Sequence, residues 1–258
     1  MHTENQYQQA EFAHNSWAEH YDYVYHQTYG DALESLTKET VSEVTRLVKE
    51  GSSIIDYGCG TGRLTIPLAL AGKGYKIHAV DSCQQLLNEL TLKCEKRGIQ
   101  DINTYPAKIS EYDGPSADMA LATLLVLNYI STRDEMQRSL ENIAKHLNPG
   151  GHLMFDLPLD LVFHIPTVTV KNPLEGFYRQ VELTPCSEEN ADPCYSYHDT
   201  CKGIDEHGIF GYENRFIIRR WTSDEIEKML LNLNFERVQD NVGRLNKFGV
   251  NYFLFKRI

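Results

Sequence analysis

The chain has 258 residues, of which 41% are hydrophobic and 24% are charged, so it can bury one large folded core. It carries 25 Lys and Arg against 36 Asp and Glu, a net charge of −11 at pH 7. This acidic balance disfavours a protein that holds nucleic acid by general phosphate neutralisation, although a local basic groove stays compatible with it.

Targeting and cysteine content favour a cytoplasmic protein. The first ten residues lack the basic start and apolar core of a secretory signal, and no run approaches the roughly 20 apolar residues of a membrane span. Six cysteines are too few for a disulfide scaffold at this length. Cys186, Cys194, His198 and Cys201 lack the C-x-x-C spacing of structural zinc sites, so we expect no metal.

Residues 1–50 are expected to form an N-terminal helical lid region. A first segment, 7–29, is crowded with rings, which could pack between helices or form an aromatic cage for a cationic amine. From Ala32 to a terminating Gly51, apolar residues follow the three-and-four spacing of an amphipathic helix. The rings of the first segment are Tyr7, Phe12, His14, Trp17, His20, Tyr21, Tyr23, Tyr25, His26 and Tyr29.

Residues 51–157 alternate between strand and helix patterns. Strands are predicted at 53–57, 76–80, 103–105, 118–122 and 152–157, and helices at 63–71, 83–97 and 136–147, with a turn at 148–151. Alternation of this kind predicts a parallel sheet covered by helices on both faces.

The pattern changes after residue 157. Residues 158–220 are β-rich and have no linker composition, so we interpret them as an insertion in a single domain spanning 1–258. Residues 221–258 begin with the capping box Thr222 to Glu225, followed by a predicted helix at 224–233 and closing strands at 235–239 and 250–256.

The most informative segment is a glycine-rich turn between a strand and a helix. Asp56 ends the strand, Gly58, Gly60 and Gly62 form the turn, and Asp81 ends the next strand roughly 20 residues further on, where a carboxylate can bind both hydroxyls of a ribose. A dinucleotide fingerprint would need glycine at Arg63, and no Walker phosphate loop occurs.

At these residues the chain resembles the class I S-adenosylmethionine-dependent methyltransferases, whose first motif is commonly D-x-G-C-G-T-G. The resemblance implies an α/β, Rossmann-like doubly wound seven-stranded sheet, mostly parallel with an antiparallel C-terminal strand, plus a β-rich insertion. It covers most of the chain and extends to segments 17–22, 80–82, 118–121, 147–153 and 219–226.

The resemblance also implies the residues that bind S-adenosylmethionine, within a cofactor-binding core at 51–157. Asp56 would reach its ammonium, Asp81 its ribose and Ser82 its adenine. Arg63 could pair with its carboxylate or could simply be a solvated residue of the first helical turn. The full implied set is Tyr21, Asp56, Gly58, Cys59, Gly60, Gly62, Arg63, Asp81, Ser82, Ile109 and Leu124.

One position departs from the family pattern. Where many relatives carry an Asp that accepts the adenine amino group, this chain has Lys108. An ammonium cannot accept that hydrogen bond, so adenine recognition would depend on the backbone amide of Ile109, on Ser82 and on apolar stacking.

The resemblance favours a small-molecule acceptor, methylated on N or O beneath a substrate cover formed by residues 158–220. Tyr25, Asn128 and Tyr129 are candidate substrate contacts. A general base is needed only for a protonated acceptor, and no catalytic residue is assigned. The candidate bases are His20, His26, Asp156, His164 and His198.

Two other functions remain open. For any of the three functions we expect a monomer or homodimer. An RNA or protein methyltransferase would need the basic residues to form one face. A sensor or scaffold that binds the cofactor without transferase activity is the other reading, for which Lys108 is the only hint. The basic residues are Arg215, Arg219, Arg220, Lys247, Lys256 and Arg257.

Overall fold

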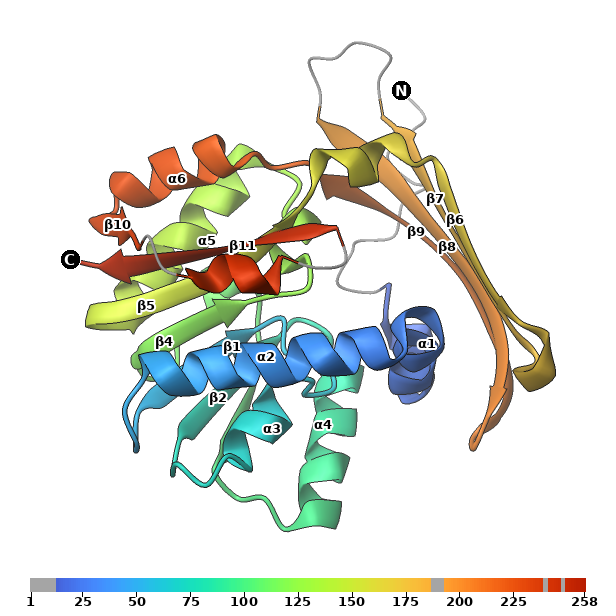
Figure 1. The fold of residues 1–258 in the computed structure, drawn as a ribbon, viewed down its shortest axis with the longest axis horizontal. Helices are drawn as coiled ribbons and strands as arrows, with labels where there is room; N and C mark the ends of the chain where they lie inside the picture. Colours follow the sequence, from blue (N-terminus) through green and yellow to red (C-terminus); the bar gives the residue numbers. More distant parts are fainter. Residues whose placement is uncertain (1–12, 187–192, 239–240, 247–248) are drawn as a thin grey trace.

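The computed structural model describes residues 13–186, 193–238, 241–246 and 249–258. Tyr7 and Phe12 of the ring-rich segment, Gln239 of a predicted strand and the basic residue Lys247 lie outside the described residues. The described chain forms two sheets, of seven and four strands, with helices around the larger one (Figure 1).

The seven-stranded sheet has the order β10-β11-β5-β4-β1-β2-β3. The neighbouring strands from β3 through β5 pair in parallel, whereas β11 pairs antiparallel with both β5 and β10. This confirms the predicted doubly wound sheet with an antiparallel C-terminal strand. The strands are β1 (Ser53–Tyr57), β2 (Lys76–Asp81), β3 (Ile102–Pro106), β4 (Ala117–Ala122), β5 (Leu147–Pro158), β10 (Phe235–Arg237) and β11 (Val250–Arg257).

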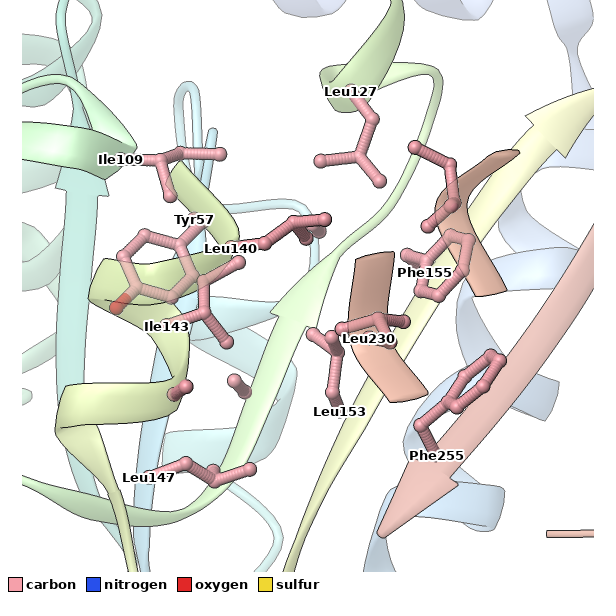
Figure 2. Close-up of a cluster of buried hydrophobic side chains, with 14 of the residues drawn as sticks. Tyr57, Ile109, Leu127, Leu140, Ile143, Leu147, Leu153, Phe155, Leu230 and Phe255 are labelled. Carbon is pink, nitrogen blue, oxygen red and sulfur yellow. The ribbon is translucent and has the colours of Figure 1, made fainter. Parts of the chain in front are cut away.

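Helices cover both faces of this sheet because its strands alternate apolar side chains between the two sides. Along β1, Ile54 packs in the core beneath α2 and α3, and Ile55 and Tyr57 pack on the opposite side. Figure 2 shows that second core, where Leu140 of α5 and Leu230 of α6 meet the sheet. The helices are α2 (Asp31–Leu47), α3 (Thr65–Ala69), α4 (Gln84–Arg97), α5 (Arg133–His146) and α6 (Ser223–Leu231).

Local sequence signals place most helices close to their observed positions. Two predicted elements differ from the structure, a helix and a turn. The Thr222 hydroxyl and the Glu225 carboxylate complete the predicted capping box of α6. The helix predicted at 63–71 is shorter, because the glycine turn extends through residue 64. The turn predicted at 148–151 lies inside β5, where the register against β4 shifts between Ala117 and Met119.

The four-stranded sheet confirms the predicted β-rich insertion. It is antiparallel and curved, and it arches over α1 (Tyr21–Tyr29) (Figure 1). Its inner face packs on the N-terminal helices in a cluster that includes Trp17, Val24 and Tyr212. The strands are β6 (Thr167–Asn172), β7 (Phe177–Pro185), β8 (Cys194–Asp205) and β9 (Gly208–Arg219).

A buried ion pair lies on the inner face of this second sheet. The Arg179 guanidinium donates to both Asp199 oxygens at 3.1 and 2.8 Å, and it also donates to the Thr28 hydroxyl of α1 at 3.0 Å. Both charged side chains are nearly inaccessible, so their hydrogen bonds must replace those to water. The pair therefore ties α1 to the sheet that covers it.

Candidate functional site

A cavity of about 980 Å³ lies at the carboxyl ends of the strands, beside the glycine turn. In a doubly wound sheet this edge is where ligands bind, since chain connections on the two sides of β1 run in opposite directions. Every residue predicted to bind the cofactor lines this cavity: Tyr21, Asp56, Gly58, Cys59, Gly60, Gly62, Arg63, Asp81, Ser82, Ile109 and Leu124.

Gly58 and Gly62, the two ends of the glycine turn, cannot be replaced by residues with side chains without strain. Gly58 and Gly62 have φ angles of +65° and +95°, a region that L-residues with side chains rarely adopt. A Cβ on Gly58 would overlap Val126, and one on Gly62 would lie 2.5 Å from Cδ1 of Leu90. The turn therefore presents bare backbone to the cavity.

Asp81 is held rigidly at the end of β2. Its Oδ2 accepts from the Gly60 amide and its Oδ1 from the Cys83 amide, each at 2.9 Å. Burial raises the pKa of this carboxyl, and the two amide hydrogen bonds oppose that shift. The carboxylate is thus fixed between the glycine turn and the start of α4.

Asp56 lies deeper, at 3% exposure. Its Oδ2 accepts from the Thr65 hydroxyl at 2.6 Å, a partner that sequence reasoning missed. Burial raises the pKa of Asp56 to about 6, while the Thr65 hydrogen bond and the nearby Arg63 lower it. The side chain is therefore prepared to gain a cationic partner from a ligand.

Arg63 is a structural part of the cavity wall. Its Nη2 donates to the Thr123 hydroxyl at 2.8 Å and its Nη1 to the Thr37 hydroxyl at 3.3 Å. These bonds join the glycine turn to α2 and to the loop after β4. Arg63 is partly exposed, and these two hydroxyls hold its side chain at the cavity wall.

Helix α1 closes over the turn. A Cβ on Gly60 would lie 3.8 Å from the Tyr21 ring, so that ring sits directly against the glycine backbone. The Thr61 hydroxyl donates to Asp22 at 2.5 Å, and Asp22 also pairs with Lys93 of α4. Sequence reasoning missed this Asp22 contact because its partners are distant in the chain.

An aromatic end of the cavity lies beyond Tyr21. Tyr25 stacks on Tyr21 with ring centroids 4.3 Å apart, and Tyr129 lies across from them, 5.8 Å from His14. Tyr25 and Tyr129 were predicted substrate contacts, and both line the cavity, as does His26. His14 lines it too, although only its place among the rings of the N-terminal segment pointed to it.

Two candidate bases and one predicted substrate contact are engaged in structural roles outside the cavity lining. His20 Nδ1 lies 2.7 Å from Asp205 Oδ2, where it fastens the N-terminal helices to the β8–β9 hairpin. Asp156 is fully buried, and its two oxygens accept from the amides of Leu124 and Leu125 at 2.5 and 2.7 Å. Asn128 donates to the Arg219 carbonyl at 2.8 Å.

The other two histidine candidates lie on the surface. His164 is exposed and its Nδ1 contacts the Asp160 carbonyl oxygen. His198 lies between Glu182 and Glu213 on the outer face of the second sheet. Cys201 of the same strand is buried on the inner face, because side chains alternate along a strand. This alternation separates two members of the considered zinc set.

The cavity end that holds Ile109 also holds Lys108 and a carboxylate that the sequence did not reveal. Glu135, in the first turn of α5, lines the cavity beside them and accepts from the Ser110 hydroxyl at 2.5 Å.

The described residues contain no group of three or more His, Cys, Asp or Glu side chains able to hold a metal ion. None of the described helices has the length and apolarity needed to cross a membrane.

Residues 54–151 match the model of a methyltransferase domain family. Curated relatives include a ubiquinone biosynthesis O-methyltransferase of Rickettsia prowazekii (strain Madrid E), 25% identical over 140 residues, 54% of this chain and 52% of that protein. Another is the putative methyltransferase YqeM of Bacillus subtilis (strain 168), 28% identical over 109 residues, 42% of this chain and 43% of the relative. The chain thus spans about half the length of the curated relatives it matches.

Solved structures share the fold across nearly the whole chain. An S-adenosylmethionine-dependent methyltransferase from Clostridium acetobutylicum ATCC 824 has a TM-score of 0.77 at 18% identity, covering 93% of this chain and 98% of that one. CalS10, an amino pentose methyltransferase from Micromonospora echinaspora, has a TM-score of 0.71 at 16% identity, covering 92% and 96%. Residues 54–151 thus match a methyltransferase domain, and the whole chain shares the fold of these solved methyltransferases.

Proposed function

We propose that the protein transfers a methyl group from S-adenosylmethionine to a nitrogen or oxygen atom of a small molecule. One observation carries the proposal: every residue assigned to the cofactor by resemblance lines a single cavity, which continues to an aromatic end under α1. S-adenosylmethionine supplies an electrophilic methyl group on a sulfonium sulfur. The protein mainly has to orient an acceptor against that group and exclude water.

The residues present suit this ligand. Gly58, Gly60 and Gly62 line the cavity with backbone alone, and the methionine portion would lie against them. A Cβ on Gly58 or Gly62 would also overlap a neighbouring side chain. Asp56 would accept from its ammonium. Each oxygen of Asp81 already accepts one amide, and a carboxylate oxygen can accept a further hydrogen bond, so the ribose hydroxyls can still bind there.

The parts outside the core would select the acceptor. We assign residues 1–50 as a lid, 51–157 and 221–258 as the core, and 158–220 as the substrate cover, because the second sheet arches over α1 (Figure 1). Relatives named for ubiquinone biosynthesis and for amino pentose methylation support a small acceptor. A cytoplasmic location and a monomer or homodimer stay predictions.

The macromolecular alternative has less support. Arg219 and Arg220 lie at the end of β9, near Glu225 and Asp160, which partly neutralise them. Lys256 and Arg257 lie at the far end of β11 in the other sheet (Figure 1). The basic residues that the structure describes therefore belong to separated elements rather than one face.

Calorimetric titration with S-adenosylhomocysteine, the demethylated product, tests the proposal. We expect binding by the intact protein and loss of most of it in Asp81→Ala, with Asp113→Ala as control because that side chain is 92% exposed. Absence of binding by the intact protein would refute the assignment. A screen with labelled S-adenosylmethionine against amines, phenols, carboxylates and RNA separates the functions, and transfer to none of them would favour a sensor.

A further inference from the structure

His14 lies in the aromatic end of the cavity, among rings from four different elements. Its ring centroid is 5.3 Å from Trp17, 5.7 Å from Tyr21, 5.8 Å from Tyr129 and 6.4 Å from Phe216. These contacts fix the plane of the imidazole. His14 is only partly buried, and it lines the cavity.

The imidazole nitrogens of His14 have no hydrogen-bond partner among the residues that the structure describes. This distinguishes it from His20, whose Nδ1 meets Asp205, and from His198, whose two nitrogens meet Glu182 and Glu213. Within the cavity lining, His14 therefore offers nitrogen atoms that a bound molecule can reach. Position, ring support and free nitrogens together give it the geometry of a proton acceptor.

The electrostatic surroundings keep this imidazole neutral at pH 7. Burial lowers the pKa of His14 to about 4, Asp199 of β8 raises it, and Arg179 of β7 lowers it. The neighbouring phenols stay protonated, because burial raises the pKa of Tyr21 on α1 and of Tyr129 well above the usual range. His14 is then a neutral base among protonated phenols.

We propose that His14 accepts the proton of an aromatic hydroxyl acceptor, a phenol or catechol, bound between Tyr25 and Tyr129. This inference rests on the proposed methyltransferase function. As the acceptor oxygen bonds to the methyl carbon, the carbon–sulfur bond breaks and its electron pair stays on sulfur. The hydroxyl proton passes to a His14 nitrogen and then to solvent.

Charge conservation explains how a weak base can serve here. Transfer removes the positive charge of the sulfonium while the imidazole gains one, so the net charge of the cavity does not change. A cationic amine is disfavoured, because its charge would join an end of the cavity where burial already opposes protonation of His14. A neutral amine attacks through its lone pair and needs no base at that step.

The test uses His14→Gln, which keeps a polar side chain of similar size but cannot take a proton. His164→Gln is the matched control, because His164 is exposed and outside the cavity lining. With labelled S-adenosylmethionine and catechol, we expect His14→Gln to lower kcat by roughly 10²- to 10⁴-fold. Affinity for S-adenosylhomocysteine should be unchanged in both variants.

A second readout does not depend on turnover. In NMR spectra of the ¹⁵N-histidine-labelled protein, the His14 signal is the one that is absent from the spectrum of His14→Gln. In the intact protein, this signal should remain that of a neutral imidazole from pH 5.5 to 8. It should shift when catechol is added to the protein saturated with S-adenosylhomocysteine.

Each failure has a distinct meaning. If the intact protein does not bind S-adenosylhomocysteine, the proposed function itself fails. If it binds but methylates neither phenol nor catechol, or methylates only benzylamine, the acceptor class is wrong while the function stands. A wild-type kcat in His14→Gln, or a His14 signal that does not shift when catechol is added, would overturn the role of His14.

Discussion

The pH dependence of cofactor affinity tests the proposed role of Asp56 most directly. Its carboxyl is 3% exposed, and burial raises its pKa to about 6. Only the carboxylate form carries the negative charge that pairs with the ammonium of S-adenosylhomocysteine, and the neutral acid binds that ammonium much more weakly. The affinity should therefore fall as the pH drops below the pKa of Asp56.

The magnitude follows from the fraction of Asp56 that is ionised in the free protein. With a pKa of about 6, about nine-tenths is ionised at pH 7 and about one-tenth at pH 5. The dissociation constant should thus rise about tenfold over this range, or about 1.4 kcal/mol. A carboxyl with an ordinary pKa would change the affinity by only a few per cent.

The raised pKa of Asp56 also makes its contribution to the stability of the folded protein depend on pH. Because the folded-state pKa of Asp56 is raised, the folded protein binds more protons than the unfolded chain between about pH 4 and 6. This residue's contribution to stability is fully present below the unfolded-state pKa and is lost as the pH rises through about 6. A bound ammonium reduces that loss by restoring the ionised form.

Calorimetric titration with S-adenosylhomocysteine at pH 5, 6 and 7 measures the effect. Asp56→Asn is the control, because it keeps the shape and the oxygen that accepts from Thr65 but cannot ionise. It should bind more weakly at pH 7 and lose the part of the pH dependence that Asp56 causes. Equal affinity of the intact protein at pH 5 and 7, or an unchanged pH dependence in Asp56→Asn, would refute the reasoning.

Two further substitutions test the framework around the cavity. Asp156→Ala should lower the free energy of unfolding, measured by urea denaturation, by roughly 3 kcal/mol or more. The substitution removes two charge-assisted hydrogen bonds that hold Leu124 and Leu125 at positive φ. A change below about 0.5 kcal/mol would contradict this. Gly62→Ala should weaken S-adenosylhomocysteine binding and thermal stability more than Gly98→Ala, which has positive φ but open space around it. Equal losses in both would show that packing against the turn does not matter.

Strand positions and the glycine turn were predictable because their signals are local. Apolar alternation marks β1 and β2, and Gly58 to Gly62 are required by backbone angles that the residue types themselves reveal. The whole predicted cofactor set lines the cavity because parallel strands place their carboxyl ends at one edge. The individual roles within that set stay predictions.

The candidate bases were harder to predict because a side chain's role depends on distant contacts. His14 and His20 are six positions apart in the same ring-rich segment, yet His14 faces the cavity while His20 is held by Asp205 of the second sheet. Asp156 ends a central strand, a common place for catalytic groups, but it supports a strained loop instead.

The sequence by itself determined the alternation of strands and helices, the glycine turn and the presence of a β-rich segment after residue 157, since each follows from local periodicity and from motif spacing. Only the tertiary structure decided which polar side chains face the cavity. That choice depends on how β7 to β9 pack against α1, with Arg179 and Asp199 buried between them. Packing over such separations in the chain leaves no local pattern in the sequence.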